Sequence, residues 1–202
     1  MTVPNKYKVA ESLFRQHGGM LRATEAIALG IHPRTLYQLR DEERLVTVSR
    51  GLYRLATLPE LAEPDLIPVA RRIPQAVVCL ISALAFHEIT TEIPHEICIA
   101  LPRTVKRPRL DYPPLRVFWF SGDAMTAGIK EHKIDGVAVK IFEPEKTVAD
   151  CFKFRNRIGL DVAIQALKLC RERRGSTPRT LLHYARICRV EHVMRPYLEA
   201  LQ

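Results

Sequence analysis

The side chains best suited to binding a ligand are hydrogen-bond donors on one short predicted helix. Arg34, Tyr37 and Gln38 lie opposite Leu36 and Leu39, because residues three or four positions apart share a helix face. Guanidinium, phenol and amide groups donate hydrogen bonds to phosphates and to base edges in the major groove of DNA. The helix residues predicted to contact DNA are Arg34, Thr35, Tyr37 and Gln38.

Glycine and proline mark the ends of the helices that position these donors. Gly30 ends one helix, because glycine readily adopts the left-handed conformation of a helix stop. Pro33 begins the next helix at its first position, where a missing N–H group costs nothing, and His32 is a weak N-cap. The apolar face of the earlier helix is expected to consist of Ala26, Ile27 and Leu29. A first helix is expected from about Asn5 to His17, with Val9, Leu13 and Phe14 on one side.

A β-hairpin is predicted after the second of these helices. Two segments rich in β-branched and aromatic residues flank Ser49-Arg50-Gly51, so Arg50 lies at the hairpin tip, where glycine permits a tight turn. Tyr53 and Leu55 are expected to face the core, and Arg54 to face outward. Three helices followed by a β-hairpin, called the wing, form a winged helix-turn-helix. We therefore add Arg50 and Arg54 to the predicted DNA-contacting residues, while a docking or structural module remains the alternative use of this fold.

The acidic residue on the same helix limits the predicted contact. Asp41 would repel phosphate, so contact with DNA is expected from the N-terminal half of the helix.

The chain is long enough for two domains. We predict a winged helix-turn-helix domain over residues 1–56, a linker over 57–64 in which two prolines bracket acidic residues, and a larger domain over 65–202. Strands are expected at 96–101, 116–120 and 137–142, and residues 76–81 fit either a buried strand or a helix start. Ser82 is the expected cap of the helix that follows.

Helical patterns dominate from Pro144 onward. They cover 144–155, 160–172, a helix opened by Thr177-Pro178, and 190–201. The fold class is therefore α+β: an N-terminal winged helix-turn-helix domain, then a larger domain with a small sheet followed by a C-terminal helical bundle.

Positive charge gathers at both ends of the chain. Residues 1–55 have a net charge of +4, residues 56–150 of −2 and residues 151–202 of +7. Basic faces attract phosphate polymers or acidic partners, and a solvated face is the alternative. Arg179, Arg186 and Arg189 are expected to share one helix face. The possible second basic surface consists of Lys168, Arg171, Arg173, Arg174, Arg179, Arg186 and Arg189.

Composition excludes several classes of protein. The 202 residues are 47% hydrophobic and contain no apolar stretch of membrane-spanning length, and no signal peptide is expected because the start is polar through Lys8. A cytoplasmic protein without membrane contact is therefore predicted. Five widely spaced cysteines, with no Cys-x-x-Cys pair, predict reduced and packed thiols.

Catalytic and metal-binding patterns fail on spacing. A restriction-type nuclease would need an acid near Lys140 to pair with Asp135, but Ala138 stands at that position. Ser121-Gly122-Asp123 reverses the nucleotidyltransferase order and has no second aspartate. No phosphate-binding glycine loop or nucleophile elbow is present. We therefore predict no catalytic residue, metal or cofactor.

Other polar and aromatic residues receive structural interpretations. His95 and Cys98 would face opposite sides of a strand, and packing or solvation better explains His183, Cys188 and His192. Glu145 and Asp150 are expected to lie at the surface or to cap a helix N-terminus. Trp119, with Phe118 and Phe120, is expected in the sheet core.

Several motifs along nearly the full chain resemble the AbiEi-like antitoxins of bacterial abortive-infection toxin-antitoxin pairs. They are Arg50-Gly51-Leu52-Tyr53-Arg54-Leu55, Ser82-Ala83-Leu84 with His87, Ile97-Cys98-Ile99-Ala100-Leu101-Pro102, Pro144-Glu145-Lys146-Thr147-Val148-Ala149-Asp150, and Arg195-Pro196-Tyr197-Leu198-Glu199-Ala200. The resemblance implies a DNA-binding repressor of its own operon, with a larger domain needed to neutralise a nucleotidyltransferase-like toxin. It does not decide between direct toxin contact and indirect neutralisation. A transcription factor without a toxin, and behind it a nuclease, are the alternatives.

Overall fold

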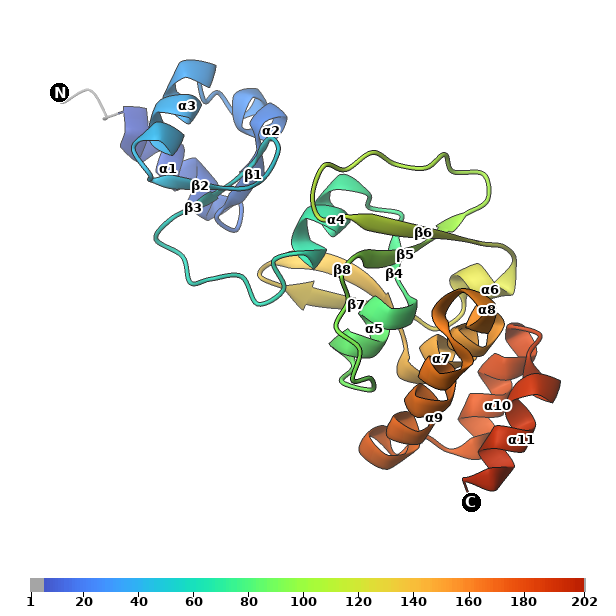
Figure 1. Ribbon diagram of the computed structural model, residues 1–202. Helices are drawn as coiled ribbons and strands as arrows, with labels where there is room; N and C mark the ends of the chain where they lie inside the picture. The colour runs from blue at the N-terminus through green and yellow to red at the C-terminus, as the bar shows by residue number, and fades with distance from the viewer. Residues whose placement is uncertain (1–5, 202) are drawn as a thin grey trace. The chain divides into compact units, whose positions relative to one another are not determined.

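The computed structural model describes residues 6–201, so the helix start expected at Asn5 lies outside the described residues. The chain divides into two compact units (Figure 1). The N-terminal unit contains the chain up to Pro68 together with Ile134–Gly136, and the second unit contains Val69–Lys133 and the chain from Val137 on. Residues 56–65 contain neither helix nor strand, and the domain limits at 56 and 64 remain a prediction.

Three helices and a three-stranded antiparallel sheet form the N-terminal unit. The helices are α1 (Lys6–Gln16), α2 (Ala23–Ala28) and α3 (Pro33–Asp41), and the strands are β1 (Met20–Arg22), β2 (Leu45–Ser49) and β3 (Leu52–Leu55). The sheet order is β1-β3-β2. The β2–β3 hairpin is the wing, and β1 pairs antiparallel with β3. This is the predicted winged helix-turn-helix arrangement.

The core of the N-terminal unit confirms most of the expected apolar positions. Phe14, Leu36 and Leu39 are completely buried, and Tyr53 and Leu55 face the same core. The expected face of α2 is wrong, because this helix is only six residues long and buries a single residue. Its other two expected core residues, and the one expected at the start of α1, are exposed: Ile27, Leu29 and Val9.

A five-stranded mixed sheet lies at the centre of the second unit. The strands are β4 (Val77–Val78), β5 (Ile97–Pro102), β6 (Leu115–Phe120), β7 (Ile129–Ile134) and β8 (Val137–Phe142), in the order β6-β5-β4-β8-β7. Strand β4 pairs antiparallel with β5 and parallel with β8, and β5 pairs parallel with β6. The fold is therefore α+β, as predicted.

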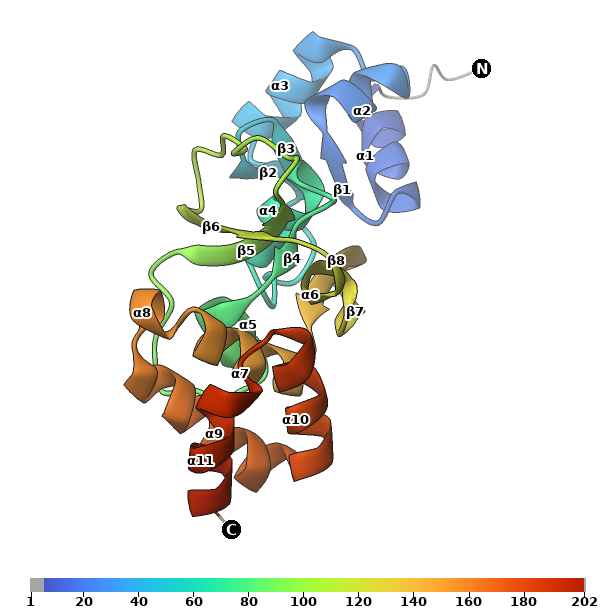
Figure 2. The same cartoon turned by 90° about the vertical axis from the view of Figure 1, so that its right-hand side faces the viewer.

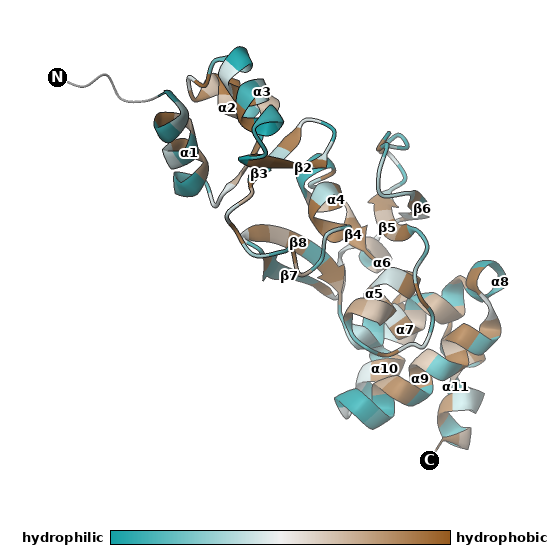
Figure 3. Cartoon of the chain, turned by 60° about the vertical axis from the view of Figure 1, so that its left-hand side comes forward, coloured by the Kyte–Doolittle hydropathy of each residue, from teal (hydrophilic) through white to brown (hydrophobic). Residues whose placement is uncertain are grey.

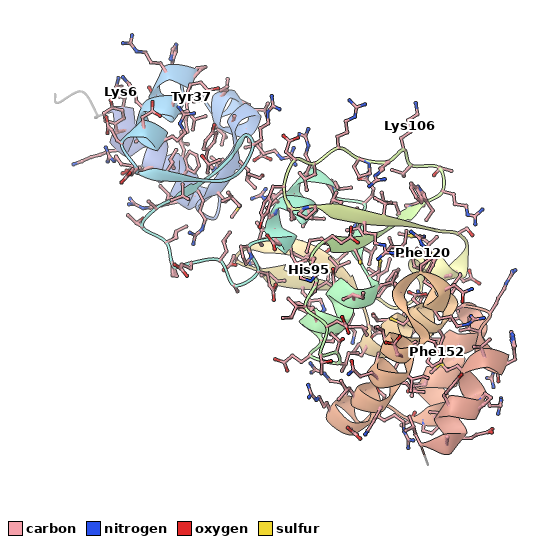
Figure 4. All side chains as sticks on the ribbon, in the orientation of Figure 1. Lys6, Tyr37, His95, Lys106, Phe120 and Phe152 are labelled. Carbon is pink, nitrogen blue, oxygen red and sulfur yellow. The ribbon has the colours of Figure 1, made fainter. Side chains whose placement is uncertain are left out.

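Further helices follow β3 along the chain; the first of them crosses the limit between the two units, and those from residue 144 on gather near the C-terminus (Figure 2). They are α4 (Leu66–Arg72), α5 (Leu80–Phe86), α6 (Asp123–Thr126), α7 (Pro144–Lys153), α8 (Arg155–Ile158), α9 (Leu160–Arg174), α10 (Pro178–Ile187) and α11 (Glu191–Ala200). Helix α7 is central, since it contacts α5, α9 and α10. The helices alternate hydrophobic and hydrophilic faces (Figure 3), and Phe152 of α7 is completely buried in the core (Figure 4).

Several sequence-based assignments in this unit need correction. The segment 76–81 is both a short strand and a helix start. Ser82 is not a cap: its hydroxyl lies within α5, where it donates to the Glu96 carbonyl and accepts from the Cys98 N–H. Trp119 is not in the core, because alternation along β6 buries its two phenylalanine neighbours and leaves the indole 38% exposed.

A fully buried ion pair lies on the inner face of α7. Lys146 Nζ lies 2.5 Å from Asp150 Oδ2, and both side chains are 0% exposed. Burial raises the pKa of the Asp150 carboxyl, and the ammonium group opposes that rise. The Cys188 thiol donates to the other carboxylate oxygen, and the ammonium lies 3.9 Å from the centroid of the Phe142 ring. The expected surface or capping role of Asp150 is therefore wrong.

Glu145 lies one turn earlier on α7. It is half-buried and accepts a hydrogen bond from the Ser176 hydroxyl at 2.7 Å. It therefore connects α7 to the segment before α10.

Candidate nucleic-acid interface

Helix α3 is held at its N-terminal end and along its inner face. The His32 ring nitrogen Nδ1 accepts a hydrogen bond from the Arg34 backbone N–H at 3.2 Å, so this residue caps the helix more effectively than expected. Leu36 and Leu39 are 0% exposed on the opposite side. The helix therefore presents a fixed outer face.

Arg34 and Tyr37 lie on that outer face and are exposed, as predicted. The Arg40 guanidinium lies 5.1 Å from the centroid of the Tyr37 ring and forms a 2.7 Å ion pair with Asp41. The hydrogen bond to this carboxylate raises the pKa of Arg40. Arg40 was not among the predicted contacts, although its spacing of three from Tyr37 could have indicated it, and its ion pair neutralises the repulsion expected from Asp41.

Two of the predicted helix contacts face the interior of the N-terminal unit. Thr35 is only 7% exposed. Gln38 is half-buried, and its amide oxygen accepts hydrogen bonds from Lys6 Nζ at 3.1 Å and from the Tyr7 hydroxyl at 3.2 Å. Figure 4 labels Lys6 on α1 and Tyr37 on α3. The expectation that Gln38 projects freely outward is therefore wrong, and Thr35, also predicted to contact DNA, is buried, because packing against α1 was not visible in the local pattern.

The wing has the predicted turn. Gly51 has a φ of 73°, a conformation that favours glycine, and Arg50 beside it is exposed. A register shift between Thr47 and Ser49 forms a bulge, which increases strand twist near the tip. Arg54 is half-buried rather than freely outward, and its guanidinium donates to the Pro59 carbonyl.

Three arginines of the predicted second basic surface contact backbone carbonyls instead. Arg171 donates to the Leu201 carbonyl at 2.5 Å, Arg173 to the Glu88 carbonyl at 2.7 Å, and Arg174 to the His87 carbonyl at 3.0 Å. These carbonyls lie at the C-terminal ends of α11 and α5. Lys168 is exposed and forms a long 3.9 Å ion pair within α9.

The other predicted members of that surface do not share one helix face. Arg179 is exposed near the start of α10, and Arg186 near its end pairs with Glu191 at 2.8 Å. Arg189 follows α10 and has a φ of 60°, so it is not helical. The expectation of a single continuous face is wrong because α10 ends two residues before Arg189.

A basic loop between β5 and β6 was missed in the sequence. Arg103, Lys106, Arg107 and Arg109 are all exposed there, and Figure 4 shows Lys106 pointing away from the sheet. The summed charge of residues 56–150 hides this cluster, because acidic residues elsewhere in that segment outweigh it. Local charge density within 103–109 could have revealed it.

Residues considered for catalysis have structural roles in this fold. Asp135 and Gly136 both have positive φ, at 48° and 78°, as the two central residues of a type I′ hairpin turn require. Lys140 donates to the Pro74 carbonyl at 3.3 Å. Asp135 therefore shapes a turn, and Lys140 contacts the backbone.

Neither a metal site nor a membrane span is found in residues 6–201. Within that range no three histidine, cysteine or acidic side chains cluster as metal ligands, and every helix is too short or too polar to cross a bilayer. The five cysteines are buried free thiols, as predicted, and burial raises the pKa of Cys170 to about 11. A deeply buried thiol with a raised pKa is a poor nucleophile.

The capped helix and its wing form a winged helix-turn-helix domain of the kind found in transcriptional regulators. Residues 9–56 match the model of the family described as "Transcriptional regulator, AbiEi antitoxin". The match coincides with this domain and confirms, over these residues, the family resemblance expected from the sequence.

Known structures extend the likeness to the remainder of the fold. The structure is similar to the crystal structure of the RV2827C protein from Mycobacterium tuberculosis, with a TM-score of 0.57 and 14% identity, covering 100% of this chain and 83% of that chain. At this identity the likeness shows the fold alone. No curated protein matches the chain.

Proposed function

We propose that this chain is a DNA-binding antitoxin that represses its own operon and counteracts a nucleotidyltransferase-like toxin. The family match over the winged helix-turn-helix supports the regulatory role. The observation that carries the proposal is the outer face of α3, where Arg34, Tyr37 and Arg40 are presented together. The protein acts by binding and not by catalysis, in the cytoplasm, where its promoter is found.

The proposed DNA contact divides into two kinds. Arg34 and Tyr37 on α3 enter the major groove of the promoter and contact base edges, while Arg50 at the wing tip contacts phosphate or the minor groove. Arg40 contacts a phosphate near the end of α3, with Asp41 orienting its guanidinium. Thr35, Gln38 and Arg54 support these residues from within the unit.

Gel shifts on the upstream promoter test the DNA proposal. The Arg34→Ala, Arg50→Ala double variant should bind at least about tenfold more weakly, because one base contact alone contributes roughly 1–3 kcal/mol. The matched control is Arg15→Ala, an exposed arginine in the last turn of α1. Unchanged affinity of the double variant, or an equal loss in the control, contradicts the proposed interface.

Co-expression with the adjacent gene tests the antitoxin proposal. The wild-type chain should rescue growth, and the Arg34→Ala, Arg50→Ala variant should also rescue when both genes are driven from a foreign promoter, because neutralisation is assigned to the second unit. Co-purification then separates direct toxin contact from indirect neutralisation. Failure of the wild-type chain to rescue growth contradicts the toxin partner while leaving promoter binding to be judged by the gel shift.

A further inference from the structure

A cavity of about 740 Å³ opens in the second unit beside α6, the end of α7 and the turn between α10 and α11. Four cationic side chains line it: Lys153, Arg155, Arg186 and Arg189. Asp123 is the single carboxylate in its lining. A concave wall with this imbalance concentrates positive potential, so the cavity attracts anions.

Two of the guanidinium groups are already oriented. Arg155 Nη1 donates to the Phe152 carbonyl at 2.9 Å, which fixes one edge of its planar group. Arg186 donates two hydrogen bonds to the Glu191 carboxylate, from Nε at 2.8 Å and from Nη2 at 3.2 Å. This carboxylate lies outside the cavity lining. Lys153 is exposed at the same wall. Side chains held in this way lose less conformational freedom when they bind a ligand.

Arg189 stands where the backbone favours glycine. Its φ is 60°, and the Val190 N–H donates to the Ala185 carbonyl at 2.8 Å, which is the hydrogen bond of a Schellman helix end. A side chain in this left-handed position strains the backbone, as it also does at Glu43 and Glu88, which follow α3 and α5. Arg189 is distinguished by its side chain, which lines the cationic cavity.

We propose that this cavity binds a small anion with two or more adjacent phosphate groups. Guanidinium groups match phosphate oxygens in pairs, and several cations at one wall suit a ligand with several phosphates. The volume lies in the range of small-molecule sites and exceeds what a single phosphate fills. Ile187, Val190 and Val193 supply an apolar part of the lining, so the ligand can extend beyond its phosphates. A concave wall of this kind fits a compact ligand better than the convex backbone of duplex DNA.

Calorimetric titration of the full chain with inorganic diphosphate and triphosphate tests the proposal. Arg189→Gly should weaken triphosphate binding at least about tenfold, since a charge-assisted hydrogen bond is lost. The same variant should melt at an equal or higher temperature, because glycine relieves the strained φ. This separates loss of the site from loss of the fold. Arg189→Lys should retain part of the affinity, and Lys133→Ala, an exposed lysine on β7 outside the lining, should bind like the wild type.

Adenosine triphosphate in the same assay distinguishes the ligand's source. Tighter binding than inorganic triphosphate supports a nucleotide, and equal binding supports recognition of the phosphates alone. Absence of binding by all three probes at millimolar concentration overturns the proposal. It is equally overturned if Arg189→Gly and Arg155→Ala both bind like the wild type, or if Lys133→Ala weakens binding as much as they do. The proposal is independent of operator binding by the N-terminal unit.

Discussion

The buried pair of α7 gives a sharp prediction for stability. Asp150→Asn leaves the Lys146 ammonium without its carboxylate in a site where both side chains are 0% exposed. Removing one partner of a buried ion pair costs about 3–5 kcal/mol, because an uncompensated charge stays out of water. Domains of this size unfold at a cost of about 5–15 kcal/mol, so the loss is a large fraction of the total.

Urea denaturation with matched variants measures this loss. The transition midpoint of Asp150→Asn should fall with little change in slope, which marks a change in stability alone. Lys146→Met combined with Asp150→Leu should recover most of the loss, because apolar side chains of similar volume need no charge partner. Glu172→Gln removes a surface pair with the same spacing of four and should cost less than about 1 kcal/mol. A small effect of Asp150→Asn, or a double variant as unstable as the single one, refutes the reasoning.

Three further predictions concern stability. Gly128→Ala should lower the melting temperature more than Gly136→Ala. Both glycines have positive φ, but only at Gly128 would a new Cβ meet another side-chain atom, at 2.8 Å. Equal losses in the two variants would contradict this. Ser82→Ala should cost about 1–3 kcal/mol in urea denaturation, since the buried Cys98 N–H loses its acceptor at 2.9 Å, and a neutral result would show that another acceptor takes over. Burial lowers the pKa of His87, so the unfolded chain binds a proton there more readily than the folded chain, and stability should fall as the pH drops below the ordinary histidine pKa of about 6.5; His87→Gln should flatten that dependence, and parallel melting curves would disprove it.

Elements with a strong apolar period were predictable from the sequence. The leucines of α3 lie on its one buried face. The continuous apolar residues of β5 reflect burial on both faces of the sheet, and the alternating residues of β8 reflect burial mainly on one face. Strand β7 was missed because it is an edge strand whose exposed residues are largely charged, which is typical of protected sheet edges.

The roles of single polar side chains were less predictable. Gln38 faces Lys6 and Tyr7 through packing between helices that are far apart in sequence. Arg174 contacts a carbonyl 87 positions earlier, so no local pattern could assign it. An acid four residues after a lysine is usually a surface pair, and only the packed fold shows that Asp150 is buried. The exposed positions of Arg34 on α3 and of Arg50 at the wing tip followed from local geometry and were predicted, whereas Arg40 was not.

The carbonyl contacts of Arg171, Arg173 and Arg174 affect how experiments on this chain must be designed. These side chains act as substitutes for helix end caps, because they place positive charge and N–H donors on the last carbonyls of α11 and α5. These guanidinium groups already donate hydrogen bonds to carbonyls of the same chain. A mutational scan that removes positive charge from α9 would therefore also destabilise two helix ends. A loss of function in such variants would be mistaken for a lost binding surface. The melting temperature of each variant must therefore be measured as well.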